Sequence, residues 1–183
     1  MFFAVLLSVL ASPPIADTTV NFAVVERDLT GDGTHEVLSL TGVGKTLDEL
    51  AVTFVIRSSG QVLYTKSWHL RRASFDPRRR ISDAELRARL RDYGRSFFEP
   101  SKFMTPAEFL SWLARSARLR IAEIPGVIAR DMTPPDSLRA AGLWQDMQAA
   151  PITTFSFSPG GDFVTAIGWT AADKRFYHLF ECC

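Results

Sequence analysis

The sequence predicts an α+β domain in which strands from both ends of the chain form one antiparallel sheet and about three helices pack on one face. Apolar residues alternate, or are β-branched, in residues 19–70 and 153–180, whereas residues 82–149 have helical spacing. Hydrophobic residues make up 46% of the 183 residues, which is enough for a substantial core. Two separate domains are less favoured, because the three C-terminal strands would form a thin sheet alone.

The N-terminus has the pattern of a signal peptide. Residues 2–10 form an apolar run that is too short to span a bilayer, which needs about 20 residues. Val9-Leu10-Ala11 fits a cleavage site, and two prolines follow it. No basic residue precedes the run, so a first strand or buried arm is the alternative. We expect residues 1–16 to be a signal peptide, residues 17–183 to be one domain, and the protein to be periplasmic or extracellular.

Four strands are expected before residue 71. Alternating apolar residues indicate the first strand, and β-branched runs indicate the others. The segments are residues 20–27, 37–40, 50–57 and 62–70. Ser58-Ser59-Gly60-Gln61 has the composition of a hairpin turn between the last two of these strands.

Three helices are expected in residues 82–149. Ser82-Asp83-Ala84-Glu85 and Thr105-Pro106-Ala107-Glu108 are capping boxes, each followed by an apolar stripe. Thr133-Pro134-Pro135-Asp136 begins the third helix, which ends before Pro151.

Three more strands are expected after the helices. They occupy residues 153–157, 163–170 and 175–180, with turn-forming residues between them. The two cysteines of the chain, Cys182 and Cys183, exclude a disulfide scaffold. They close the last strand, or they form an intermolecular disulfide after export.

Residues 28–36 are the sharpest local signal. Oxygen-bearing side chains recur at every second position of this Gly-containing segment, namely Asp28, Thr30, Asp32, Thr34 and Glu36. Such a loop can surround a hard cation. The segment resembles the calcium loop of FG-GAP (integrin-α-type) repeats, although Thr30 and Glu36 depart from that pattern. The resemblance implies one weak calcium site with these five residues as ligands. The alternative is a plain hairpin turn, in which Asp caps local amides.

The middle of the chain carries the positive charge. Residues 66–120 contain 14 basic and 6 acidic residues, although the whole chain has a net charge of +1. The arginines concentrate in residues 71–95, and an arginine patch can bind an anionic or acidic partner. The alternative is a solvated or internally paired surface. Nucleic acid is not the expected partner of an exported protein.

No catalytic constellation is recognisable. The sequence lacks the G-x-S-x-G, H-E-x-x-H and phosphate-loop patterns, and it offers no catalytic residue. We therefore expect a small exported protein of binding or structural type rather than an enzyme, with calcium as its one candidate cofactor. Two alternatives remain open. One is an enzyme of unrecognised family with a site between sheet and helices. The other is an inhibitor or immunity-type protein that uses its basic helical face.

Overall fold

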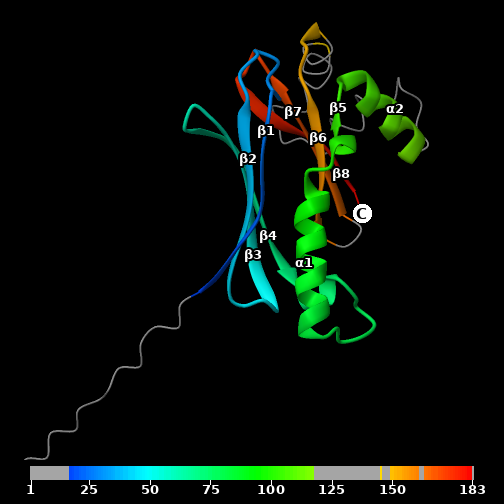
Figure 1. Cartoon of the computed structure of the whole chain (residues 1–183). Helices are drawn as coiled ribbons and strands as arrows, with labels where there is room; N and C mark the ends of the chain where they lie inside the picture. Colours follow the sequence, from blue (N-terminus) through cyan, green and yellow to red (C-terminus); the bar gives the residue numbers. More distant parts are fainter. Residues whose placement is uncertain (1–16, 118–144, 146–148, 161–162, 183) are drawn as a thin grey trace, which may run out of the picture.

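A computed structural model describes residues 17–117, 145, 149–160 and 163–182 (Figure 1). The first four strands form an antiparallel sheet in the order β1-β2-β3-β4. Their bounds are β1 Thr18–Arg27, β2 Glu36–Thr46, β3 Glu49–Ser58 and β4 Gln61–Arg71. The predicted turn between β3 and β4 is confirmed: Ser59 and Gly60 have φ values of 47° and 84°, as a primed hairpin turn requires.

The C-terminal strands form a second sheet, so the prediction of one sheet is wrong. This sheet has the order β5-β6-β7-β8 and is also antiparallel. Its strands are β5 Phe103–Met104, β6 Thr154–Gly160, β7 Phe163–Thr170 and β8 Arg175–Cys182. Sequence periodicity misses β5, because a two-residue strand has no measurable period.

Aromatic side chains explain why the second sheet packs against the first instead of extending it. The ring of Phe54 in β3 lies 5.5 Å from that of Phe155 and 5.1 Å from that of Phe157. Tyr64 in β4 likewise meets Phe176 at 6.1 Å. Face-to-face packing buries the apolar faces of both sheets against each other, whereas edge-to-edge pairing would leave them to be covered by helices alone.

Two α-helices are found in the described residues, and both begin at the predicted capping boxes. Helix α1 (Asp83–Phe97) has Ser82 as its N-cap, and α2 (Pro106–Ala117) follows the reciprocal Thr105–Glu108 pair. The expectation of about three helices on one face of a single sheet is therefore wrong. The third predicted helix, from residue 133, lies outside the described residues apart from residues 145 and 149.

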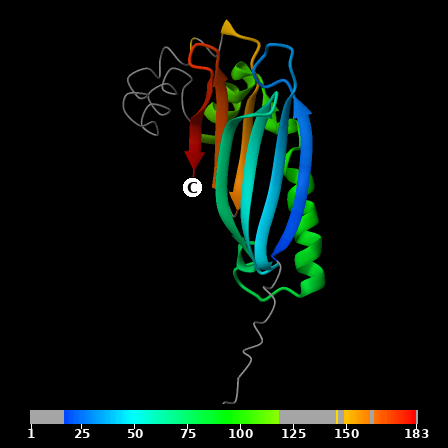
Figure 2. The same cartoon turned by 90° about the vertical axis from the view of Figure 1, so that its left-hand side faces the viewer.

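Helix α1 and the second sheet share the layer that covers the first sheet (Figures 1 and 2). Helix α2 lies against the other side of the second sheet, where Trp112 meets Phe180 at 6.0 Å. One cluster of buried apolar residues includes members of both sheets and both helices. Within the described residues, no helix is long and apolar enough to cross a membrane.

Candidate functional site

The 28–36 loop joins β1 to β2, and its carboxylates accept hydrogen bonds from the loop itself. Asp28 accepts the backbone N–H groups of Gly31 and Gly33, at 2.6 and 3.0 Å. Glu36 is fully buried and accepts the Leu29 N–H at 2.7 Å and the Thr30 hydroxyl at 3.2 Å. The five residues predicted as calcium ligands thus share one loop, and the carboxylates of Asp28 and Glu36 already accept hydrogen bonds within it.

Asp32 is more exposed than Glu36 and bonds to another predicted ligand. Its side chain accepts the Thr34 N–H at 2.7 Å, and this bond lowers the pKa of the carboxyl group. No group of three or more His, Cys, Asp or Glu side chains with the geometry of a metal site occurs among the described residues. Calcium binding by this loop stays a prediction.

The same loop attaches the first sheet to the start of β6. Leu29 is fully buried, and its carbonyl oxygen accepts the Thr153 N–H at 3.2 Å. Gly31 has a φ of 74°, and a Cβ there would lie 2.6 Å from the Pro151 carbonyl oxygen. This close approach leaves no room for a side chain, so the loop has a clear structural role.

Part of the arginine-rich segment is paired within the chain. Arg72 donates to Asp48, to the Ile81 carbonyl oxygen and to Asp83, each at 2.6 Å. These contacts join the β2–β3 turn to the start of α1, and Arg72 holds the pKa of Asp83 below its usual value. The side chain of Arg72 is 15% exposed, so it is not available to a partner.

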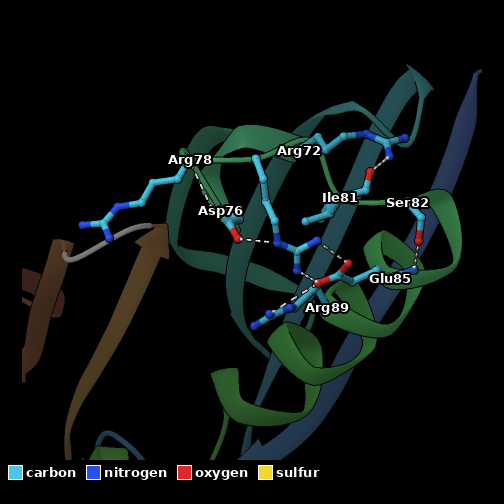
Figure 3. Close-up of polar contacts among 8 residues, drawn as sticks. Arg72, Asp76, Arg78, Ile81, Ser82, Glu85 and Arg89 are labelled. Atoms are coloured by element: carbon cyan, nitrogen blue, oxygen red, sulfur yellow. Dashed lines mark hydrogen bonds and ion pairs between the residues drawn. The ribbon is translucent and has the colours of Figure 1, made fainter.

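A second set of pairs surrounds Glu85 (Figure 3). Arg79 donates two hydrogen bonds to Glu85 and lies 3.0 Å from Asp76, while Arg89 lies 3.6 Å from Glu85. The hydrogen bonds from Arg79 are the main cause of the lowered pKa of Glu85. The internally paired alternative therefore describes much of this basic segment.

Three arginines on α1 instead line a groove between this helix and β1. They are Arg87, Arg91 and Arg95, at successive i, i+4 positions on one side of the helix. The groove has a volume of about 400 Å³. Its other lining residues are Asn21 and a set of apolar side chains: Val20, Phe22, Leu47 and Leu90.

The groove arginines have weaker internal partners than Arg72 and Arg79. Within the described part of the chain, neither Arg87 nor Arg91 has a carboxylate oxygen within 4.0 Å. Arg95 has Asp92 at 3.8 Å, but both side chains are at least two-thirds exposed, so solvent screens this pair. These cations can therefore interact with an external anion.

Helix α1 packs closely on β1 beside the groove. A Cβ at Gly94 would lie 2.9 Å from the Phe22 carbonyl oxygen, so glycine permits this approach.

The sequence could have revealed one wall of the groove but not the other. The four-residue spacing of Arg87, Arg91 and Arg95 is visible in the sequence and could have indicated a row of arginines on a helix. The β1 wall could not have been found in this way, because it is about 70 residues away in the chain.

A polar cluster joins β4 to β8 and includes one of the two histidines in predicted strands. The Tyr64 hydroxyl lies 2.7 Å from His178 Nε2, and Lys66 lies 2.9 Å from Glu181. Burial raises the pKa of Tyr64 and lowers that of His178. A neutral imidazole that accepts the Tyr64 O–H fits both shifts, and it makes the cluster a link between the two sheets.

His178 Nδ1 lies 4.0 Å from Glu181, which is too far for a hydrogen bond that would activate the imidazole. The second histidine, His69, lies 3.8 Å from Glu49 on an exposed part of β4. Neither arrangement places a nucleophile next to an oriented base.

Comparisons of the chain with protein-family models, curated proteins and solved structures find no match.

Proposed function

We propose that this chain is a binding protein that captures an acidic polypeptide through the groove between α1 and β1. One observation carries the proposal: Arg87, Arg91 and Arg95 line a groove that also has apolar side chains. Among the residues that the structure describes, Arg87 and Arg91 have no carboxylate oxygen within 4.0 Å. Arginine binds carboxylates through two parallel hydrogen bonds, and its weak hydration suits a protein interface. The proposal develops the alternative of a partner protein with a basic helical face.

The composition of the groove favours a polypeptide over nucleic acid. Four apolar side chains line it together with the arginines, so a partner needs apolar groups as well as carboxylates. Nucleic-acid binding instead depends on a broad basic surface that follows the phosphates. Here the neighbouring arginines Arg72 and Arg79 are engaged with Asp and Glu side chains.

Binding of sodium poly-L-glutamate at neutral pH and low salt tests the proposal. We expect the double variant Arg87→Gln/Arg91→Gln to bind this probe at least fivefold more weakly than the wild type. The matched control is Arg78→Gln/Arg80→Gln, which removes the same charge from exposed positions outside the groove. Equal weakening in both variants would indicate diffuse attraction, and absence of binding by the wild type would contradict the proposal.

We also propose that the protein is exported and that the mature chain begins at Ser12 or Asp17. The apolar run of residues 2–10 and the small residues after it support this proposal. Intact-mass measurement on the protein from its native cells should find the shortened chain. A full-length chain in the cytoplasm would contradict it.

A further inference from the structure

We infer that a pocket between α1 and the ends of β4 and β6 binds a small monocarboxylate with an apolar body, and that the Lys102 side chain holds the carboxylate. This site is distinct from the groove lined by Arg87, Arg91 and Arg95, and it goes beyond the function proposed above. The rings of the pocket, its charge and a hydroxyl group that can donate to a ligand indicate this class of ligand.

Aromatic rings form the apolar part of the pocket. Phe75, which follows β4, and Tyr93 and Phe97 of α1 line it together with Leu70 of β4. The ring centroid of Tyr93 lies 6.4 Å from that of Phe75 and 5.8 Å from that of Phe97. The volume of about 370 Å³ falls within the range of small-molecule sites, about 300–1,000 Å³. A small apolar group can therefore be buried against these rings.

Lys102 gives the pocket a positive charge that its lining does not balance. Among the described residues, no Asp or Glu lines the pocket, and no carboxylate oxygen lies within 4.0 Å of Lys102 Nζ. Partial burial of the amine lowers the pKa of Lys102, and the charge of Glu99 only partly opposes this shift. A carboxylate bound at this amine would favour its charged form and offset the cost of burial.

A single cation beside aromatic rings favours a ligand with a single negative charge. A carboxylate has one negative charge at neutral pH, whereas a phosphate monoester has about 1.5–2. The second charge of a phosphate would remain unpaired against Phe75 and Phe97, which costs free energy. The Ser74 hydroxyl accepts the Arg71 N–H at 3.3 Å, so its own proton is available to a carboxylate oxygen. Lys102 and Ser74 are thus donors that the pocket offers to the carboxylate.

NMR titration of the isotope-labelled full chain with phenylacetate tests the inference. We expect a Kd of about 5 mM or lower, with shifts at the amides of Ser96 and Lys102. Phenylacetamide has the same ring without the charge, and acetate has the charge without the ring, so each should bind at least fivefold more weakly. Lys102→Met should weaken phenylacetate binding at least fivefold and leave phenylacetamide binding unchanged.

Two variants are matched controls. Lys45→Met removes the same charge from an exposed position in β2, and Arg87→Gln/Arg91→Gln removes charges of the groove. We expect both variants to bind phenylacetate as the wild type does, because neither changes a residue that lines the pocket.

Absence of amide shifts around the pocket in the wild type would overturn the inference without the use of any variant. Equal binding of phenylacetamide or acetate would show that the pocket does not select both parts of the ligand, and unchanged binding by Lys102→Met would exclude Lys102 as the donor. Loss of binding in Lys45→Met would indicate diffuse attraction, and loss in Arg87→Gln/Arg91→Gln would place the anion in the groove. Each of these results would also overturn the inference, whereas none alters the test of the groove with poly-L-glutamate.

Discussion

Glu36 shows how a single residue can have a structural role where the sequence indicates a ligand. Its buried carboxylate accepts a backbone N–H and a hydroxyl group from the loop that precedes it. We expect Glu36→Ala to lower the free energy of unfolding by about 1–3 kcal/mol, because it leaves the buried Leu29 N–H without an acceptor. Urea denaturation measures the effect. The exposed Glu26 in β1 provides a control, and Glu26→Ala should change stability by less than about 0.5 kcal/mol.

The calcium prediction belongs to the same loop and has a separate readout. The resemblance predicts a dissociation constant of about 10⁻⁴ to 10⁻³ M, as in extracellular modules. Calcium should then raise the Tm of the wild type relative to chelator, and Asp28→Ala or Asp32→Ala should remove that difference. If the wild type has the same Tm in millimolar calcium and in chelator, the loop is a hairpin turn without a calcium site.

Two elements, β4 and β8, meet through groups whose protonation affects folding. Burial is the main cause of the lowered pKa of His178 in the folded protein, and the positive charge of Lys66 adds to it. The unfolded chain therefore binds a proton more readily near pH 6.5 than the folded chain, so folding stability falls as the pH drops through that region. Glu181 also has a lowered pKa, but it titrates at lower pH.

We expect the Tm of the wild type to fall between pH 7.5 and pH 5.5, and that of His178→Gln to fall less. Thermal melts monitored by circular dichroism at several pH values provide the measurement. The variant can still accept the Tyr64 hydroxyl through its amide oxygen but cannot take up a proton. Parallel curves for the two proteins would show that His178 does not control this pH dependence.

The whole molecule has a hydrophobic core that neither sheet completes alone. Deleting residues 152–183 removes β6, β7 and β8 and exposes Phe54, Tyr64 and Trp68 of the first sheet. Burial of one such side chain contributes roughly 1.5–3 kcal/mol, so we expect the truncated chain to unfold. Circular dichroism and a melting curve test this. A sharp, native-like transition in residues 17–150 would show that the first sheet and α1 fold independently.

Local patterns in the sequence determined most of the elements. The four strands of the first sheet, the start of α1 and the start of α2 depend on alternation, β-branching and capping, which act between neighbouring residues. The row of Arg87, Arg91 and Arg95 is also local, since it follows from the helical repeat. The sequence alone could therefore place these arginines on one side of a helix.

Tertiary structure alone decided how the elements combine. Whether β6 to β8 extend the first sheet or pack on it depends on contacts such as Phe54 with Phe157, between residues about 100 positions apart. The same long-range packing buries Glu36 and pairs Arg72 with Asp48, while it leaves Arg87 and Arg91 beside an apolar wall from β1. Charge and polarity are properties of a residue, whereas burial and pairing are set by its neighbours in space.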